Sequence, residues 1–327
     1  MTGKRACAAL CGALAIAAAG RAAADEAQPW RHGIIKAKSD AGIFMMIKKG
    51  GFAEKQGLTL DIQEFGNDVI EIQAILSGGL DSYDGSPGAA IAAAARGADI
   101  KVLGCEWPGV PYVIYARPAI KTIQDLKGKT MAISAPGASP DVVAHAVLAK
   151  YGIPVDAVHF ANLGADLDRF KAVVAGVADA TVVSNEYAPI AEQQGLRTLL
   201  RASEVVPDYM RVCIFTTAKV LASRRQDAAH FLAAEMQSLH YVLGHRDEVI
   251  ALTRATIHAK PDDARPAFMY DDSVKTKSID PAISIPVAKL QWMEQTLLKS
   301  GTLKQPYDVT KMIDAGPREA ALALAGK

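Results

Sequence analysis

The sequence lacks the features that mark a nucleic-acid-binding, disulfide-rich or strongly charged protein. Its 327 residues carry 36 basic and 35 acidic side chains with no basic stripe, which argues against nucleic-acid binding. Four cysteines are too few for a disulfide framework, and aromatic residues make up only 6% of the chain. Half of the residues are hydrophobic. We therefore expect a globular protein rich in alanine helices, with one large core or two smaller ones.

Long apolar runs are also absent, except at the start of the chain. Lys4 and Arg5 precede an apolar run over residues 6–20, and residues 22–24 are three alanines that suit a cleavage site. The run is too short and too rich in alanine for a convincing membrane span, so we predict a secretory signal peptide over residues 1–24. Its removal takes away three basic groups and leaves 33 basic against 35 acidic groups, a net charge of −2.

Two cysteines remain after the predicted cleavage. Cys7 and Cys11 leave with the signal peptide, whereas Cys105 and Cys213 belong to the mature chain. One bridge and two buried thiols are both compatible with this spacing. We expect free thiols.

Motifs of common enzymes are missing as well. The stretch Gly137-Ala138-Ser139-Pro140-Asp141 lacks the final glycine of a nucleophile elbow, and Gly128-Lys129-Thr130 lacks the first glycine of a phosphate-binding loop. His240 and His245 are five residues apart, off a shared helix face, and no zinc-binding H-E-x-x-H occurs. We therefore predict no catalytic residue, no metal and no cofactor.

What the sequence does contain is a pattern that occurs twice. The segment A-I-L-S-G-G-L-D-S-Y-D-G-S (74–86) aligns without a gap with A-V-V-A-G-V-A-D-A-T-V-V-S (172–184). Each reads as a helix ending near glycine, a turn with aspartate and a short strand. Earlier apolar strands, over 33–38 and 129–134, lead through small-residue loops into helices. The order β-α-β-α-β thus occurs twice, about 95–98 residues apart.

Alternating strands and helices predict parallel sheets covered by helices, with ligands bound beyond the carboxyl ends of the strands. The apolar segments 111–118 and 210–218 would connect the two units and form a hinge. We place lobe one at 30–115 and 213–327 and lobe two at 116–212. After residue 218 we expect helices that pack on lobe one, over 224–244, 245–259, 262–271, 283–299 and 309–324.

The chain resembles a type II periplasmic solute-binding protein of an ABC importer, in the nitrate, sulfonate, taurine and thiamine-precursor (NMT1/THI5-like) branch. The resemblance covers about residues 31–315 and rests on T-I-Q-D-L-K-G-K-T-M-A-I-S (122–134), A-V-V-A-G-V-A-D-A-T-V-V (172–183), and L-S-G-G-L-D (76–81) followed by Gly85. It implies a monomeric, non-enzymatic periplasmic receptor whose two lobes close on a small solute and deliver it to a membrane permease. A related enzyme branch, the yeast-type pyrimidine-phosphate synthases, uses a cysteine-rich iron motif that this chain lacks.

The loops at the predicted strand ends supply the candidate ligand-binding residues. Small residues there let a solute approach backbone N–H groups, and hydroxyl groups add donors. Ser86-Pro87 and Ser139-Pro140 each open a helix, so these serines could cap the helix, contact the solute, or do both. Trp107, Tyr112 and Tyr187 could stack on a planar solute. The full set is Ser39, Asp40, Ala41, Gly42, Gly85, Ser86, Gly88, Trp107, Tyr112, Gly137, Ala138, Ser139, Asn185, Glu186 and Tyr187.

Charge leaves two kinds of solute open. These candidate loops contain no lysine or arginine, although Arg117 and Arg211 lie at the predicted hinge. An organic acid, a sulfonate or carboxylate with or without an aromatic ring, would use helix ends, hydroxyl groups and one hinge arginine; this is our first expectation. The alternative is a pyrimidine or another nitrogen heterocycle held partly by Glu186, unless Glu186 pairs with a hinge arginine. A pyrimidine-synthase-like enzyme ranks last.

Overall fold

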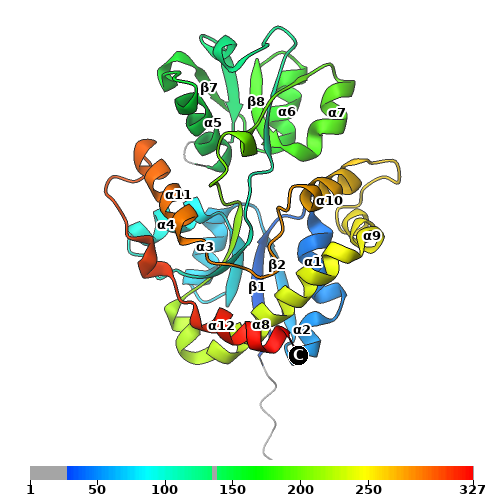
Figure 1. Cartoon of the computed structure of the whole chain (residues 1–327), viewed down its shortest axis with the longest axis vertical. Helices are drawn as coiled ribbons and strands as arrows, with labels where there is room; N and C mark the ends of the chain where they lie inside the picture. Colours follow the sequence, from blue (N-terminus) through cyan, green and yellow to red (C-terminus); the bar gives the residue numbers. More distant parts are fainter. Residues whose placement is uncertain (1–27, 135–137, 327) are drawn as a thin grey trace, which may run out of the picture.

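The chain forms two lobes, each built around a five-stranded sheet (Figure 1). A computed structural model describes residues 28–134 and 138–326. The first sheet has the order β2 (Leu60–Phe65), β1 (Trp30–Ile35), β3 (Ser82–Gly85), β10 (Val212–Thr216) and β4 (Lys101–Trp107). The second has the order β7 (His159–Asn162), β6 (Thr130–Ile133), β8 (Ala180–Ser184), β5 (Tyr112–Ala116) and β9 (Arg197–Arg201). We call them lobe one and lobe two. The predicted two-lobed α/β architecture is confirmed.

The sheets share one plan. Three strands of each sheet are parallel, since β1 pairs with β2 and β3, and β6 pairs with β7 and β8. The connections run through helices: α1 (Ala41–Lys49), α2 (Phe52–Lys55) and α3 (Asp68–Leu76) in lobe one, and α5 (Ser139–Lys150) and α6 (Asp166–Val174) in lobe two. A fourth strand, β10 or β5, enters each sheet antiparallel to its neighbours. Parallel strands with helical crossovers place the carboxyl ends of both sheets at the facing edges of the lobes.

The repeat seen in the sequence is retained in atomic detail. Gly78 and Gly176 both have a positive φ, 83° and 75°, which lets each helix end in a tight turn. The carboxylate of Asp81 accepts a hydrogen bond from the backbone of Arg31 in β1 at 2.9 Å. Asp179 repeats this contact with the backbone of Thr130 in β6 at 3.0 Å. The aspartates therefore fix the start of the third strand against the first strand in both lobes.

Two short segments connect the lobes. Strand β5 pairs along its whole length with β8 and β9, so residues 112–116 belong to the second sheet. Lobe two therefore begins before the expected boundary at residue 116, because β5, which we expected to be the crossing, is a strand of the second sheet. The crossings are residues 108–111 and the irregular segment that precedes β10. A hinge at these segments leaves both sheets intact when the lobes move.

The C-terminal helices were predicted with partly wrong boundaries. They are α8 (Ala218–Gly244), α9 (Arg246–Thr256), α10 (Arg265–Lys275), α11 (Val287–Lys299) and α12 (Gly316–Ala325). Helix α8 starts earlier than expected, because Thr217 caps it and Arg224, with φ of −129°, only kinks it. The expected helix over 309–324 is two pieces, a 3₁₀ turn at Val309–Met312 and α12, because Pro317 begins a new helix.

Two of these helices also reach lobe two. Asp272 of α10 accepts a hydrogen bond from the side chain of Asn185, at the end of β8, and lies 3.4 Å from the guanidinium of Arg201. Helix α11 touches α5 as well as α4 (Pro87–Ala95). The C-terminal helices thus pack on lobe one, as expected, and α10 and α11 also span the gap between the lobes.

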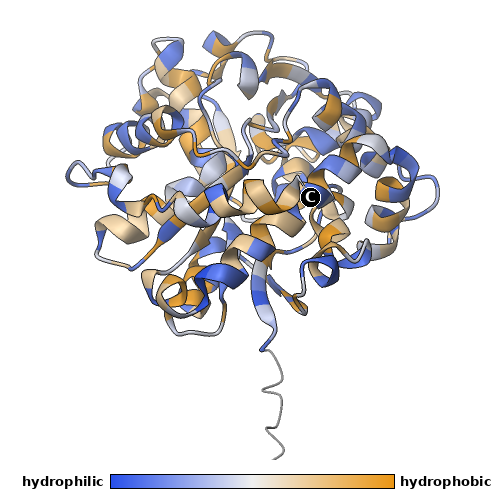
Figure 2. Ribbon diagram, turned by 60° about the horizontal axis from the view of Figure 1, so that its bottom comes forward, coloured by the Kyte–Doolittle hydropathy of each residue, from blue (hydrophilic) through white to orange (hydrophobic). Residues whose placement is uncertain are grey.

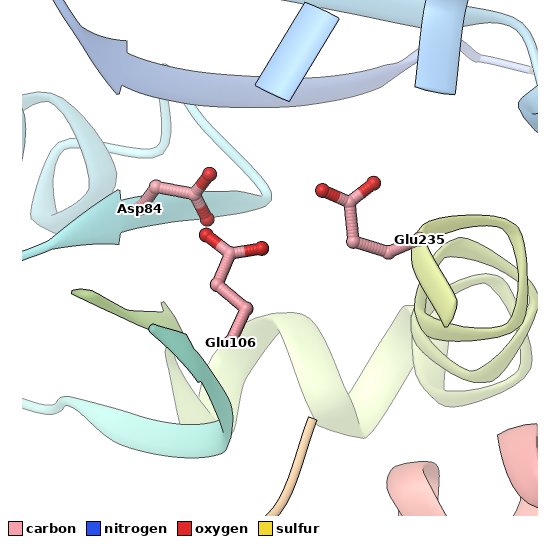
Figure 3. A group of neighbouring side chains, drawn as sticks. All are labelled: Asp84, Glu106 and Glu235. Carbon is pink, nitrogen blue, oxygen red and sulfur yellow. The ribbon is translucent and has the colours of Figure 1, made fainter. Parts of the chain in front are cut away.

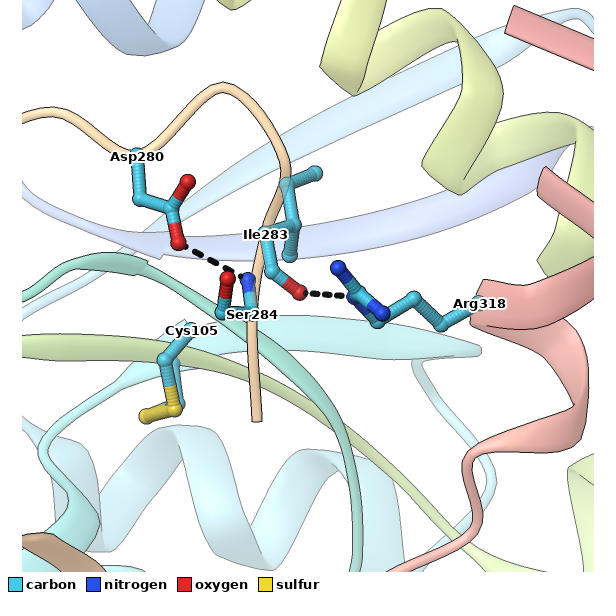
Figure 4. Close-up of a disulfide and its surroundings, with 6 residues drawn as sticks. Cys105, Asp280, Ile283, Ser284 and Arg318 are labelled. Atoms are coloured by element: carbon cyan, nitrogen blue, oxygen red, sulfur yellow. Dashed lines mark hydrogen bonds between the residues drawn. A yellow bond between two sulfur atoms is a disulfide. The ribbon is translucent and has the colours of Figure 1, made fainter. Parts of the chain in front are cut away.

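The expectation of free thiols is also wrong, because Cys105 and Cys213 form a disulfide. They lie on β4 and β10, which are neighbours in the first sheet although 108 residues separate them in the chain. Figure 4 shows the segment 280–284 lying against Cys105, with the Asp280 carboxylate accepting from the Ser284 backbone at 3.0 Å. The guanidinium of Arg318 donates to the carbonyl of Ile283 at 2.6 Å, which ties α12 to this segment.

Hydrophobic side chains fill both faces of the first sheet and the space around the second. One core cluster joins β1 and α8, where Trp30 stacks on Phe231 with ring centroids 5.6 Å apart. Figure 2 shows the hydrophilic stretches mainly in the peripheral loops and outer helix turns. The remaining helices are α7 (Ala188–Gln193) and short 3₁₀ turns at Ile123–Leu126, Val155–Ala157, Asn185–Tyr187 and Ala202–Glu204. Within the described residues, no helix combines the length and apolar character needed to cross a bilayer.

Candidate functional site

A cavity of about 170 Å³ lies between the lobes, where the predicted ligand loops meet. Lobe one contributes the end of β1, the loop into α1, the first residue of α3 and the end of β3. Lobe two contributes Tyr112 and Ser139, and the returning crossing contributes Arg211. The complete lining is Ile34, Ile35, Lys36, Ala37, Lys38, Asp40, Ala41, Phe44, Asp68, Asp84, Gly85, Ser86, Tyr112, Ser139, Arg211 and Val212.

The candidate residues from the sequence divide into two groups around this cavity. Six of them line it: Asp40, Ala41, Gly85, Ser86, Tyr112 and Ser139. Gly137 lies outside the described residues. The others are not part of the lining: Ser39, Gly42, Gly88, Trp107, Ala138, Asn185, Glu186 and Tyr187.

Three residues of the second group are packing positions. The N–H of Gly42 donates to the hydroxyl of Thr253 in α9 at 2.9 Å, and a Cβ there would lie 2.2 Å from a backbone oxygen of the same helix. Gly88 faces Met293 of α11, and Tyr187 stacks on Phe170 inside lobe two with centroids 4.8 Å apart. Glycine at residue 42 therefore permits a close contact between α1 and α9.

Trp107 supports the site from behind. Its ring stacks on Phe44, with centroids 5.6 Å apart, and the Arg211 guanidinium lies over the ring at 4.5 Å. Both of these neighbours line the cavity, whereas Trp107 faces a second hollow behind the crossing segments. The indole thus holds Arg211 in place by a cation–π contact.

The two serines do not cap their helices. Ser86 is the N-cap residue of α4 but its hydroxyl makes no capping hydrogen bond, and Ser139 is already the first residue of α5, with Ala138 as its N-cap. Instead the two hydroxyl groups lie 3.3 Å apart across the gap between the lobes. Their hydroxyl groups are therefore placed to contact both a solute and the opposite lobe.

The sequence named Arg211 as one of two hinge arginines that an acid could use, but it did not identify the lysines of the site. Strand β1 ends at Ile35 and not at Lys38, so Lys36 and Lys38 lie in the loop that lines the cavity. Lys38 is exposed and pairs with Asp166 of lobe two at 3.7 Å, and this carboxylate raises the pKa of Lys38. The cavity wall is therefore more basic than the candidate loops suggested.

Arg211 is the second cation of the wall. Burial alone would lower its pKa, but the Asp40 carboxylate that it binds keeps that pKa above the usual value. Among the described residues, its Nη1 atom has no hydrogen-bond partner. An unused, buried guanidinium donor beside a cavity is a strong site for an acidic group.

Carboxyl groups surround these cations. Asp68, the first residue of α3, accepts a hydrogen bond from the Ser86 backbone at 2.7 Å, and burial raises its pKa. Glu186 accepts a hydrogen bond from Ser39, and burial raises the pKa of this carboxyl too. The sequence left open whether Glu186 pairs with a hinge arginine. No such ion pair is seen in the described part of the chain, where Arg211 binds Asp40.

Asp84 links the cavity to a buried group of acids. Its carboxyl group and those of Glu106 on β4 and Glu235 on α8 point toward one another, with oxygens within 4.8 Å (Figure 3). Burial raises the pKa of Asp84 to about 7 and that of the two glutamates well above the usual range. Carboxyl groups this close share protons rather than all ionise, so the cluster carries little charge near neutral pH.

A serine, a histidine and an aspartate also meet below the cavity. The His32 ring lies 2.7 Å from the Ser82 hydroxyl and 3.2 Å from the Asp84 carboxylate. However, Ser82 is fully buried, already accepts a hydrogen bond from Trp30 at 2.7 Å, and is not part of the cavity lining. Burial lowers the pKa of His32 to about 3. A substrate in the cavity has no access to this hydroxyl, so the arrangement is a structural network.

The comparisons with known proteins agree with this architecture. A family model described as NMT1/THI5 like matches residues 38–249. A Brucella abortus protein named as a binding protein is 32% identical over 130 residues, which is 40% of each chain.

Solved structures extend the likeness to nearly the whole chain. The alkanesulfonate-binding protein SsuA from Xanthomonas axonopodis pv. citri, bound to MOPS, has a TM-score of 0.73 and 18% identity, covering 89% of this chain and 100% of its own. The periplasmic nitrate-binding protein NrtA from Synechocystis PCC 6803 has a TM-score of 0.72 and 17% identity, covering 92% and 90%. These similarities confirm the periplasmic-binding-protein fold.

Proposed function

Because the chain belongs to the NMT1/THI5-like family, we propose that it is the solute receptor of an ABC importer and binds a small organic acid between its lobes. The receptor works outside the cytoplasm as a monomer and hands its solute to a membrane permease. The fold shared with sulfonate- and nitrate-binding proteins supports this role. Binding without catalysis agrees with the inaccessible hydroxyl of Ser82.

The observation that carries the proposal is the free guanidinium donor of Arg211. Its Nη1 atom is buried, unpartnered among the described residues, and belongs to a residue of the cavity wall. Lys38 and the hydroxyl groups of Ser86 and Ser139 add donors from both lobes. A sulfonate or carboxylate oxygen at Arg211 would satisfy the unused donor, and contacts to both lobes would favour the closed form.

The test is a binding screen of the purified protein by calorimetry and thermal shift. The probes are short alkanesulfonates, aliphatic and aromatic carboxylates, nitrate, and pyrimidines. We expect an organic acid to bind best, and Arg211→Gln to weaken it by at least about tenfold, because a buried charge-assisted hydrogen bond is lost.

Arg117→Gln is the matched control, since Arg117 follows β5 near Gly176 and is not part of the cavity lining. It should leave affinity unchanged. Undiminished acid binding in Arg211→Gln, or no acid binding in wild type, contradicts the proposal.

A nitrogen heterocycle is the second candidate, because Glu186, although outside the lining of this cavity, has a raised pKa and interacts with Lys38 and Asp40, which line it. A carboxyl group in this state can exchange hydrogen bonds with a ring N–H and ring nitrogen. Stronger binding of a pyrimidine than of every acid in the same screen would favour it.

A further inference from the structure

Three acidic side chains meet inside lobe one, and we call them the acid cluster. Asp84 on β3, Glu106 on β4 and Glu235 on α8 point toward one another, and one oxygen of each lies within 4.8 Å of the other two (Figure 3). Each residue is at most 5% exposed, so the cluster differs from the solvated acids that are common on protein surfaces. Carboxyl groups buried this close together are unfavourable unless something binds their oxygens.

Most oxygens of the acid cluster have no partner in the protein. Among the described residues, both oxygens of Glu106, Oδ1 of Asp84 and Oε2 of Glu235 are buried and make no hydrogen bond. Glu106 is 1% exposed, and its carboxyl group is aimed at the other two (Figure 3). A buried acceptor without a donor is rare in native proteins, so these atoms point to a ligand that the chain itself does not supply.

Two basic side chains lie close to the acid cluster, and neither neutralises it. The Arg211 guanidinium attracts Glu106 through its charge, but it is bound to Asp40. The Nε2 atom of His32 lies 3.2 Å from Oδ2 of Asp84, which orients this carboxyl group and leaves its Oδ1 atom free. In the part of the chain that the structure describes, no lysine or arginine forms an ion pair with any member of the cluster.

The spacing of the oxygens suits a divalent cation. Two oxygens bound to one cation are at most twice the cation–oxygen distance apart, which is about 4.6–5.2 Å for Ca²⁺ and about 4.0–4.2 Å for Mg²⁺. The limit of 4.8 Å in the acid cluster lies in the range for Ca²⁺. Carboxylates are also the ligands that Ca²⁺ and Mn²⁺ prefer, and each of the three offers two oxygens. The cluster thus matches these ions in ligand type and in spacing.

A cation also needs a path to its site. Asp84 belongs both to the acid cluster and to the lining of the cavity between the lobes, so an ion that enters this cavity meets the cluster from there. The expectation of no metal came from local motifs. The three acids lie on separate elements, far apart in the chain, and only the tertiary structure brings them together.

We propose that Asp84, Glu106 and Glu235 form a binding site for one divalent cation that prefers oxygen ligands, Ca²⁺ or Mn²⁺. The bound ion displaces the protons that the carboxyl groups otherwise share. It joins β3, β4 and α8 through the interior of lobe one and so stabilises this lobe. The site goes beyond the proposed function, since the ion binds in the absence of any solute.

The test measures ion binding by the full chain after a chelator has removed metal, with no solute present. Calorimetry should show one Ca²⁺ or Mn²⁺ per chain, bound at least about tenfold more tightly than Mg²⁺. Saturating ion should raise Tm by about 3 °C or more, because it binds only the native state. The ion is also supplied during refolding from urea, so that slow entry to a buried site does not hide binding.

Glu106→Gln should abolish both effects, because the amide keeps the size of the side chain and removes its charge. Glu235→Gln repeats the test from α8. Glu71→Gln is the matched control, since Glu71 is as buried as the cluster and its oxygens also lack partners among the described residues, but it is not a member. It should leave the stoichiometry and the ion-induced rise in Tm unchanged. Circular dichroism of each ion-free variant verifies that it is folded.

The outcomes decide the proposal without reference to solute binding. Loss of the ion in Glu106→Gln and Glu235→Gln, but not in Glu71→Gln, supports it. If wild type binds no ion, either as purified or after refolding with ion, the proposal is overturned and the carboxyl groups hold only protons. Unchanged binding in Glu106→Gln overturns it too, because the ion then binds elsewhere. If both cluster variants fail to fold, anomalous scattering from wild-type crystals grown with Mn²⁺ gives the same decision, by an ion at Glu106 or away from it.

Discussion

Glu71 is the residue whose burial has the clearest thermodynamic consequence. It lies in α3, is fully buried, and neither of its carboxyl oxygens has a hydrogen-bond partner in the part of the chain that the structure describes. Burial, followed by the charges of Asp68 and Asp84, raises its pKa to about 10. Its carboxyl group is therefore protonated in the native protein at neutral pH and releases a proton on unfolding.

The native state thus binds more protons than the unfolded state between pH 4.5, the ordinary pKa of a glutamate carboxyl, and about pH 10. Stability from Glu71 is present at low pH and is lost as pH rises, by about 1.4 kcal/mol per pH unit. Glu71→Gln removes this dependence. We expect the variant to gain stability over wild type between pH 6.5 and 9, measured by urea unfolding.

This pH range lies above the range in which His32 affects stability. Because the pKa of His32 is lowered to about 3, its contribution to stability rises with pH between about 3 and 6.5, opposite to that of Glu71. Glu192→Gln, at an exposed position of α7, is the control and should show no such trend. A constant difference between Glu71→Gln and wild type at all pH values would mean that Glu71 is already ionised in the native protein.

A site residue could be predicted from the sequence where its position depends on the residues next to it in the chain. Asp40, Gly85, Ser86 and Ser139 were identifiable because each follows a predicted strand or opens a helix. Lys38 was missed because the apolar pattern of β1 gave no sign that the strand ends at Ile35. Side-chain contacts across the fold leave no local pattern in a sequence.

The sequence offers Arg211 and Arg117 alike as hinge arginines that could bind an acid, and nothing in it favours Arg211. Its position depends on Asp40, 171 residues earlier, and on the Trp107 ring beneath its guanidinium. Neither partner can be recognised from the residues around Arg211.

Among the secondary-structure elements, the repeated strand–helix units were predictable and the C-terminal helices were only partly so. Helix α4 begins and ends as Ser86-Pro87 and Gly97 indicate. The expected start of α11 at Ile283 is wrong, because Ile283 has a positive φ of 46° and Ser284 forms a bridge with Cys105 of β4. A tertiary contact overrides the helical pattern there.

The disulfide joins two elements on either side of lobe two. Cys105 is on the strand before the chain leaves lobe one, and Cys213 is on the strand after it returns. The bridge therefore closes a loop that contains the whole of lobe two. In the chain-entropy model, a loop of about this length stabilises the folded state by roughly 4–5 kcal/mol.

We expect reduction, or the double variant Cys105→Ala with Cys213→Ala, to lower Tm by roughly 10 °C. Thermal unfolding followed by circular dichroism measures the change, and thiol titration verifies the reduction. Reduced wild-type protein is the control for the small cavities in the variant, and both samples should melt at similar temperatures. An unchanged Tm after complete reduction would show that the bridge does not stabilise the fold.

For the molecule as a whole, function depends on the balance between an open and a closed arrangement of the lobes. Several contacts join the lobes, and three of them matter here: Ser86 with Ser139, Lys38 with Asp166, and Asp272 with Asn185 and Arg201. The first two lie at the solute cavity, and the third lies behind the crossing segments. Asp272 therefore stabilises the closed arrangement without contacting the solute.

The position of Asp272 predicts that its loss lowers the affinity for the solute, although Asp272 does not contact the solute. Asp272→Ala removes hydrogen bonds to a charged group worth about 1–3 kcal/mol, so the closed form should be less populated without solute. Small-angle scattering should show a larger radius of gyration for the unliganded variant than for wild type. Affinity should fall by the same factor as the closed population, because the binding-competent fraction sets the apparent Kd.

Asp271→Ala is the neighbouring control. Asp271 is exposed and pairs with Arg246 inside lobe one at 2.7 Å, so its loss should change neither scattering nor affinity. If Asp272→Ala weakened binding while its scattering stayed the same as that of wild type, Asp272 would act on the site directly. If both measurements stayed unchanged, α10 would contact lobe two without stabilising closure, and the cleft contacts alone would hold the lobes together.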